Sequence, residues 1–258
     1  MSYQTGTGPR TAVVTGAASP RGIGFAVASR FAAEGWPVAL LDIDAAGAEA
    51  AADKIAGEFG TRVVGIGVDV TDEDSVARAV EALAAAGLPP VGALANIAGV
   101  ASPVPFLEVD MREWRRVVDI NLTGTFLTCR ALLPQMLEHG YGRIVNMSSV
   151  SAQQGGGVFS KTPYSAAKAG VLGLTRSLAR EFAPQGITVN AVSPGVVDTD
   201  IRAGATDEAN EAALAAAVPL GRQGTPADIA ALVVFLSSED ASYITGTTQN
   251  INGGSYIA

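Results

Sequence analysis

Two side chains that could perform acid–base chemistry, Tyr164 and Lys168, lie four positions apart in the segment YSAAK. The surrounding residues 162–182 have the apolar spacing of an α-helix, and positions i and i+4 share one helix face. A free phenol has a pKa near ~10 and is a poor base at neutral pH, but a nearby ammonium favours the phenolate. We therefore expect Lys168 to lower the pKa of Tyr164 towards the working pH of a general acid or base.

A glycine-rich turn, TGAASPRGIG, follows the first predicted strand at residues 15–24. Gly16, Gly22 and Gly24 allow a tight turn and a close approach of the backbone to a pyrophosphate, which then lies at the N-terminus of the next helix. A close crossing of helix and strand would also require such glycines. The position of the turn inside a β-α-β unit favours a dinucleotide.

The second predicted strand ends at Asp42, where a carboxylate can hydrogen-bond both ribose hydroxyls of an adenosine. A 2′-phosphate at ~4 Å from this carboxylate would be repelled by ~4 kcal/mol at an effective dielectric of about 20, so NAD is favoured over NADP. Arg21 could pair with a 2′-phosphate, contact the pyrophosphate or be solvated, but Ile43 stands where a 2′-phosphate site would carry an arginine. Asp69, which ends the third predicted strand, could bind the adenine amino group or belong to a helix-entry turn.

Short β-branched runs alternate with alanine-rich helical patterns along the chain. Continuous apolar strands that alternate with helices predict an α/β fold with a parallel sheet covered by helices on both faces. Strands are expected over residues 11–16, 37–44, 62–70, 91–99, 142–149, 187–195 and 246–254, and helices over residues 22–35, 45–60, 71–87, 110–137, 162–182 and 226–236. Thr71 is expected to cap the third helix, and Pro226 to begin the last. We expect a single domain over residues 10–258, preceded by a flexible tail over residues 1–9.

The composition argues against several classes of protein. The 258 residues carry a net charge of −8 without a run of Lys or Arg, so no nucleic-acid surface is expected. The one cysteine, Cys129, cannot form an internal disulfide and is expected to be buried; with the one histidine, His139, no metal site is expected. The sequence shows no signal peptide and no apolar run of membrane length, so the expected location is the cytoplasm.

Taken together, these residues resemble the short-chain dehydrogenase/reductase family over almost the whole chain. The resemblance is carried by TGAASPRGIG (15–24), NIAG (96–99), DINLTG (119–124), NMSS (146–149), YSAAK (164–168) and SPGVVDT (193–199). It implies a Rossmann-type doubly wound sheet and an NAD(P)-dependent enzyme that transfers hydride between the cofactor and a secondary alcohol or ketone. The implied catalytic residues are Asn121, Ser149, Tyr164 and Lys168. The implied cofactor contacts, with NAD preferred to NADP, are Gly16, Ser19, Arg21, Gly22, Ile23, Gly24, Asp42, Asp69, Val70, Asn96, Ala98, Gly99, Tyr164, Lys168, Pro194, Gly195, Val197 and Thr199.

By this resemblance, Tyr164 takes the alcohol proton and Ser149 hydrogen-bonds the oxygen, while Lys168 holds the nicotinamide ribose and relays the proton through a water near Asn121. Three features depart from the family pattern. The glycine turn is two residues longer than usual, and Ile97 stands where a second asparagine is common.

The third departure concerns the catalytic serine. The separation between Ser149 and Tyr164 is two residues longer than usual, so Ser148 and Ser151 remain alternatives to Ser149. We prefer Ser149 because NMSS follows the strand directly and the glycines at 155–157 can absorb an insertion.

Residues 150–163 are expected to line the substrate pocket, and residues 200–220 to form a loop over it. A small polar alcohol, sugar or polyol is the first candidate substrate, and a 3-oxoacyl thioester is the second. A dinucleotide-binding sensor without turnover is an alternative of another class, although such proteins usually lose the Tyr or the Lys. Apolar positions on more than one face of the helices over 110–137 and 162–182 predict burial against a second subunit, and the resemblance implies a homotetramer.

Overall fold

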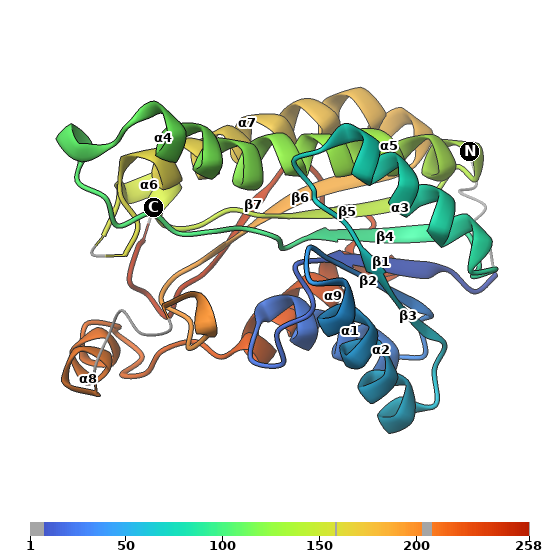
Figure 1. The fold of residues 1–258 in the computed structure, drawn as a ribbon, viewed down its shortest axis with the longest axis horizontal. Helices are drawn as coiled ribbons and strands as arrows, with labels where there is room; N and C mark the ends of the chain where they lie inside the picture. The colour runs from blue at the N-terminus through green and yellow to red at the C-terminus, as the bar shows by residue number, and fades with distance from the viewer. Residues whose placement is uncertain (1–7, 158, 203–207, 258) are drawn as a thin grey trace.

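The computed structural model describes residues 8–157, 159–202 and 208–257, and these contain one parallel sheet of seven strands (Figure 1). The strands are β1 (Thr11–Thr15), β2 (Val38–Asp42), β3 (Val63–Gly67), β4 (Val91–Asn96), β5 (Gly142–Met147), β6 (Ile187–Pro194) and β7 (Thr248–Ile251). Their order across the sheet is β3-β2-β1-β4-β5-β6-β7. The chain winds outward in both directions from the neighbours β1 and β4, so the loops at their carboxyl ends diverge and leave a crevice. The predicted Rossmann-type α/β fold is confirmed.

Helices cover both faces of the sheet (Figure 1). One face carries α1 (Ile23–Ala33), α2 (Ala45–Phe59) and α9 (Pro226–Leu236), and the other carries α3 (Glu73–Ala85), α4 (Met111–Val118), α5 (Gly124–Glu138) and α7 (Thr162–Phe182). Two short helices, α6 (Ser151–Gln154) and α8 (Glu208–Ala216), follow β5 and β6. The two faces bury separate apolar clusters, so the sheet is shielded from water on both sides.

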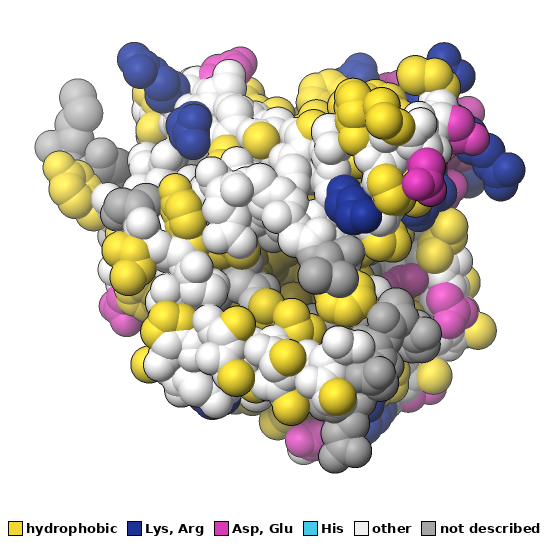
Figure 2. All heavy atoms as spheres, turned by 90° about the vertical axis from the view of Figure 1, so that its left-hand side faces the viewer, with side chains coloured by type: hydrophobic (Ala, Val, Ile, Leu, Met, Phe, Trp, Pro, Cys, Tyr) yellow, Lys and Arg dark blue, Asp and Glu magenta, His cyan; other side chains and the backbone are white. Residues whose placement is uncertain are grey.

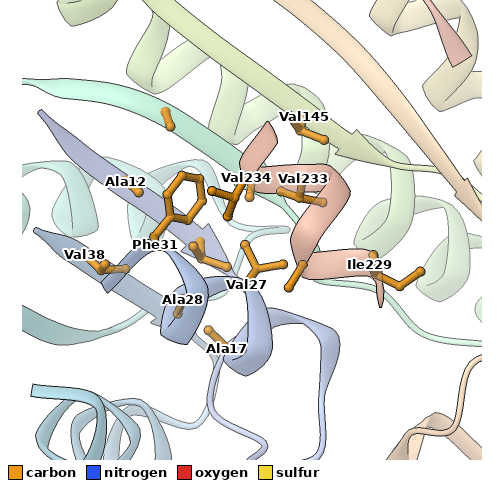
Figure 3. Packing of buried hydrophobic residues seen from close by; sticks show 14 of the residues in the cluster. Ala12, Ala17, Val27, Ala28, Phe31, Val38, Val145, Ile229, Val233 and Val234 are labelled. Carbon is orange, nitrogen blue, oxygen red and sulfur yellow. The ribbon is translucent and has the colours of Figure 1, made fainter. Parts of the chain in front are cut away.

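Helix α1 packs closely against the sheet, and a glycine in its first turn permits this approach. Phe31 and Val27 of α1 are fully buried and pack with Val234 of α9 (Figure 3). Gly24 stands where α1 passes the end of β1, and a Cβ at this position would collide with the carbonyl of Gly16. This close packing sets where the N-terminus of α1 lies relative to the crevice.

The predicted helical region over residues 110–137 is confirmed, but one of its turns is widened. Helix α4 ends at Val118, and a π-helical turn, Asp119–Thr123, leads into α5. The turn contains Asn121, and π-helical turns of this kind often occur at functional sites. A long run of helical periodicity does not reveal one widened turn, because the residue types on either side of it remain helix formers.

The expected cap of α3 is wrong by one residue. Asp72 is the N-cap and accepts a hydrogen bond from the Asp74 amide at 3.1 Å. Thr71 instead donates from its amide and its hydroxyl to Asp69. Helix α9 begins at Pro226 as expected.

The remaining expectations concern the cysteine, the N-terminal tail, the substrate loop, and membrane or metal features. Cys129 is buried, as predicted. Residues 1–7 of the predicted tail and residues 203–207 of the predicted substrate loop lie outside the described residues. Within the described ranges, no helix combines the length and apolarity needed to cross a membrane, and no three His, Cys, Asp or Glu side chains form a group that could hold a metal ion. The tail, the domain boundary at residue 10 and the cytoplasmic location stay predictions.

Candidate active site

The glycine turn joins the end of β1 to the start of α1. Gly16 has a φ of +67°, and a Cβ on it would lie 2.7 Å from the Cα of Ala98. The Gly22 amide donates to the carbonyl of Ser19 at 2.9 Å, and Gly22 caps α1, whose first turn has no acidic residue. An anion at this helix end would meet unpaired N–H groups and the positive end of the helix dipole.

A cavity of about 460 Å³, called here the larger cavity, lies beside this turn at the carboxyl ends of the strands. It is lined by Gly16, Ser19, Gly22, Ile23, Gly24, Leu41, Asp42, Ile43, Val68, Asp69, Val70, Thr71, Ile97, Ala98, Gly99, Val100, Ile120, Thr199, Asp200 and Ile201. The end of the molecule that carries α4, α6 and α8 is hollowed near its centre, with hydrophobic side chains around the hollow (Figure 2). The volume and the mixture of apolar walls with a few polar groups are typical of a small-molecule site.

The carboxylate of Asp42 is held in place by backbone amides. Its Oδ2 accepts from the Ala18 amide at 2.9 Å, and its Oδ1 accepts from the Asp44 amide at 3.1 Å. Asp69, on the same cavity, accepts from the amide and hydroxyl of Thr71, so it belongs to a helix-entry turn and also lines the cavity. An oriented carboxylate at Asp42 can accept the two hydroxyls of a ribose.

A second, smaller cavity of about 130 Å³ continues from the first. It is lined by Ile23, Ile97, Gly99, Asn121, Met147, Ser148, Ser149, Tyr164, Lys168, Pro194, Gly195, Val197, Thr199 and Ile201, of which Ile23, Ile97, Gly99, Thr199 and Ile201 also line the larger cavity. The structure therefore brings the four predicted catalytic residues to one cavity. The same cavity is lined by the predicted cofactor contacts at and after the end of β6.

Lys168 is buried on α7, with 3% of its surface exposed. Its Nζ donates to the carbonyl of Met147 at 2.8 Å and lies 5.7 Å from the centre of the Tyr164 ring. Burial lowers the pKa of this lysine to about 7, because an ammonium loses its hydration in the interior. Lys168 is therefore only partly protonated at neutral pH.

The pKa of Tyr164 moves in the direction opposite to the expected one. Burial of the phenol raises its pKa, and a hydrogen bond with Ser149 opposes that rise. The expectation of a lowered Tyr164 pKa is wrong, because desolvation of the buried phenol is the largest effect on it. The side chains share a helix face and a cavity, as predicted, but Tyr164 is a neutral phenol at neutral pH.

The three candidate serines have different partners. The Ser148 hydroxyl donates to a main-chain carbonyl of α7 at 2.9 Å, and the Ser151 hydroxyl lies 2.9 Å from that of Ser160. The Ser149 Oγ accepts from the Ser151 amide at 3.2 Å, and Ser149 lines the smaller cavity together with Tyr164, whereas Ser151 is absent from that lining. The geometry favours Ser149 as the serine that acts with Tyr164.

Asn121 is fixed by the π-helical turn and by the loop after β4. Its amide nitrogen donates to the carbonyls of Val117 at 2.8 Å and Val100 at 3.0 Å, and its Oδ1 accepts from the Val100 amide at 3.3 Å. A Cβ on Gly99 would lie 2.7 Å from this Oδ1 and 3.4 Å from the Nζ of Lys168. The glycine thus leaves the space in which the amide and the lysine approach each other.

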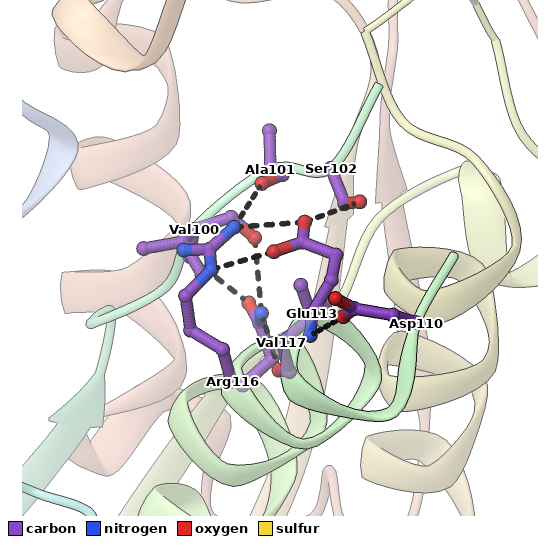
Figure 4. A network of polar contacts seen from close by, with 8 residues as sticks. Val100, Ala101, Ser102, Asp110, Glu113, Arg116 and Val117 are labelled. Carbon is purple, nitrogen blue, oxygen red and sulfur yellow. Dashed lines mark hydrogen bonds and ion pairs between the residues drawn. The ribbon is translucent and has the colours of Figure 1, made fainter. Parts of the chain in front are cut away.

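A polar network that sequence reasoning missed holds the same loop. The Ser102 hydroxyl donates to Glu113 at 2.7 Å, and the Nε of Arg116 donates to the other carboxylate oxygen at 2.8 Å (Figure 4). The hydrogen bond from Arg116 is the largest cause of a lowered pKa at Glu113. Because the Lys161 amide donates to the Ser102 carbonyl at 2.8 Å, the network also fixes the start of α7. Asp110 and Glu113 at capping-box spacing signal the start of α4, but not the contact with Ser102.

Comparison with known proteins agrees with this geometry. A family model described as enoyl-(acyl carrier protein) reductase matches residues 16–256. An uncharacterised short-chain type dehydrogenase/reductase of Sinorhizobium fredii is 43% identical over 249 residues, which cover 96% of this chain and 98% of the relative. The chain belongs to the short-chain dehydrogenase/reductase family. Enzymes of this family use a nicotinamide cofactor.

Two further family members have more specific names. A D-threitol dehydrogenase of Mycolicibacterium smegmatis is 42% identical over 245 residues, covering 95% of this chain and 92% of that protein. A 3-oxoacyl-[acyl-carrier-protein] reductase of Aquifex aeolicus is 38% identical over 247 residues, covering 96% and 97%. These names indicate that relatives of similar identity act on different alcohols or ketones.

Asn96 is placed differently from the expectation based on the family. Its amide donates to Asn146 at 2.9 Å and to the thiol of Cys129 at 3.2 Å, and it accepts from Thr128 at 2.7 Å. The side chain is 3% exposed and joins β4 to β5 and α5. The Asn96 side chain thus has a structural role, and a cofactor contact through its backbone stays a prediction.

Arg21 also departs from the expectation. It is absent from the lining of both the larger and the smaller cavity, although its neighbours in the glycine turn contribute to them. Its guanidinium instead lies 3.2 Å from Asp198 and 3.1 Å from Asp200. The expected direct contact between Arg21 and a cofactor is not supported by this placement.

Replacing Lys168 by methionine is expected to remove a pH dependence of stability. Lys168 has a pKa of about 7 in the folded protein and near 10.4 in an unfolded chain, so between these values the unfolded state binds more protons. The free energy of unfolding of the wild type should therefore rise relative to Lys168→Met as pH increases from 7. The expected slope is at most about 1.4 kcal/mol per pH unit.

Urea unfolding of both proteins at pH 6, 7, 8 and 9 measures this difference. Lys54→Met, which removes an exposed lysine of α2, is the matched control. A constant difference between wild type and Lys168→Met across this range would contradict the burial of a titrating lysine.

Proposed function

We propose that this protein transfers a hydride between NAD and a secondary alcohol or ketone on a small polar molecule such as a polyol or sugar. The observation that carries the proposal is the cluster of Tyr164, Ser149 and Lys168 in a cavity continuous with the one lined by the glycine turn and Asp42. A phenol and a serine hydroxyl that line one cavity suit proton transfer to or from an alcohol oxygen.

The residues of the larger cavity fit a nicotinamide dinucleotide. The N-terminus of α1 offers N–H groups to a pyrophosphate, and the oriented carboxylate of Asp42 offers two acceptors to a ribose diol. NAD is preferred to NADP because the same carboxylate would repel a 2′-phosphate. The ion pairs of Arg21 with Asp198 and Asp200 also make this arginine a poor partner for a 2′-phosphate.

When bound, the cofactor supplies hydride exchange at C4 of the nicotinamide. Side chains of this protein transfer the proton. In the reduction direction, Tyr164 donates its phenolic proton to the carbonyl oxygen of the substrate. Ser149, which lines the same cavity, hydrogen-bonds that oxygen. In its protonated form, Lys168, whose Nζ lies 5.7 Å from the centre of the Tyr164 ring, favours a phenolate after proton loss.

The protonation states of these groups give the reaction a pH preference. The pKa of Tyr164 is raised, so the phenol is ready to act as an acid at neutral pH. Alcohol oxidation needs the phenolate, and its rate should therefore increase as the pH rises above neutral. Oxidation is expected to need a higher pH than reduction because burial penalises the charged form of a phenol.

Sequence similarity supports a polar substrate, because the relative named D-threitol dehydrogenase matches nearly the whole chain.

The test is a substrate panel followed by absorbance of the reduced nicotinamide. Polyols, sugars and hydroxy acids are offered with NAD⁺ at pH 7 and pH 9, and 3-oxoacyl thioesters are offered with NADH. Turnover of a polyol or sugar, faster at pH 9, supports the proposal. Turnover of thioesters alone would identify a 3-oxoacyl reductase, and tight NAD⁺ binding without any turnover would indicate a sensor.

We also propose a homotetramer in solution. Met111 of α4 and Phe126 of α5 are 59% and 43% exposed, so these helices present apolar side chains to water. Light scattering is expected to give the mass of four chains, and Phe126→Arg is expected to give a smaller species because a buried charge opposes association. Lys54→Glu, on the opposite face of the sheet, is the control, and a monomeric wild type would refute the proposal.

A further inference from the structure

The glycine turn and the segment after β6 are joined by a small set of polar contacts, called here the latch. Arg21 lies 3.2 Å from Asp198 through one nitrogen and 3.1 Å from Asp200 through its Nε. The other carboxylate oxygen of Asp200 accepts from the Ser19 hydroxyl at 2.9 Å. Asp200 therefore bonds two residues of the turn at once.

The latch lies at the rim of the larger cavity. Ser19 from one loop and Thr199, Asp200 and Ile201 from the other all line that cavity. The two loops follow β1 and β6, which are separated by β4 and β5 in the sheet. Contacts between them therefore bridge the crevice from one side of the switch point to the other.

The ion pairs of the latch are individually weak, so the two loops can separate and close again repeatedly. The side chains of Arg21, Asp198 and Asp200 are 66%, 64% and 44% exposed. Exposed ion pairs contribute little to the stability of a fold and are weakened by salt. Three contacts that close one loop on another can still slow the separation of the loops, because all must break together.

We propose that Arg21 is a positioning residue that closes the larger cavity through Asp198 and Asp200 and so slows the release of the cofactor. The inference rests on the proposed function only in taking a nicotinamide dinucleotide as the ligand of this cavity. It also gives a role to the lengthened glycine turn, whose extra residues carry the arginine across to the other loop.

The experiment measures NADH dissociation from the full-length protein by stopped-flow fluorescence, with excess NAD⁺ to prevent rebinding. Arg21→Ala is expected to release NADH about 5- to 10-fold faster than the wild type, and Arg21→Lys less than that, because lysine keeps the charge but not the two-pronged geometry. Arg30→Ala is the matched control, since Arg30 of α1 makes an exposed ion pair at 2.7 Å with Glu34, the C-cap of that helix.

The aspartates separate the latch from a direct contact between Arg21 and the cofactor. If Arg21 held the pyrophosphate, Asp200→Asn would free the arginine and slow NADH release. The latch predicts that Asp198→Asn and Asp200→Asn both speed release. It also predicts that raising the salt from 0.05 to 0.5 M speeds release from the wild type more than from Arg21→Ala.

Unchanged release in Arg21→Ala, an equal change in Arg30→Ala, or slower release in Asp200→Asn would overturn the latch while leaving the proposed function intact. Faster release in the Arg21 and aspartate variants supports the latch even if no alcohol in the panel is oxidised. A wild type that binds neither NADH nor NAD⁺ would overturn both, and equilibrium titration shows this before any kinetic measurement.

Discussion

Tyr164→Phe is expected to lower kcat by about 10²- to 10⁴-fold for any alcohol that the wild type oxidises. The substitution removes only the hydroxyl that exchanges a proton with the substrate, and it keeps the ring beside Lys168. Binding of NAD⁺ should change by less than about threefold, because the larger cavity and Asp42 are untouched. The loss should therefore fall on kcat rather than on cofactor affinity.

Steady-state kinetics and a fluorescence titration of NADH measure the two parts of this prediction. Tyr243→Phe is the matched control, because Tyr243 is fully exposed and belongs to neither cavity. Ser149→Ala should show a smaller loss of kcat, since serine stabilises the oxygen but does not carry the proton. Wild-type turnover in Tyr164→Phe would exclude the phenol as the acid–base group.

The second large effect concerns the choice of cofactor. The wild type is expected to prefer NAD⁺ to NADP⁺ by on the order of 10² in kcat/KM or more, and Asp42→Ala to remove most of that preference. A repulsion of ~4 kcal/mol corresponds to about 10³-fold, and solvent at the partly exposed carboxylate reduces it. The same substitution should weaken NAD⁺ binding, because the two acceptors of the ribose diol are lost.

The ratio of kcat/KM with NAD⁺ to kcat/KM with NADP⁺ is measured for each protein on the best substrate of the panel. Asp53→Ala is the control, since Asp53 is an exposed carboxylate on α2 that lines neither the larger nor the smaller cavity. A wild type that prefers NADP⁺, or an Asp42→Ala variant with an unchanged ratio, would contradict the role given to Asp42.

The order of strands and helices followed from the sequence because its signals are local. Apolar runs bounded by glycine mark strands that are buried on both faces, and the spacing of Tyr164 and Lys168 places them on one helix face wherever that helix lies. The glycine turn is equally local, since it must fit between one strand and the next helix. The family resemblance and its candidate residues depended on such short motifs.

Other properties depend on contacts between distant segments, and only the tertiary structure decided them. The raised pKa of Tyr164 comes from burial, which no spacing along a helix reveals. The partners of Asn96 come from other strands and helices, and Arg21 meets aspartates far along the chain. Sequence patterns identify which side chains are near in the chain, whereas charge state and pairing depend on solvent exclusion and on neighbours that folding brings together.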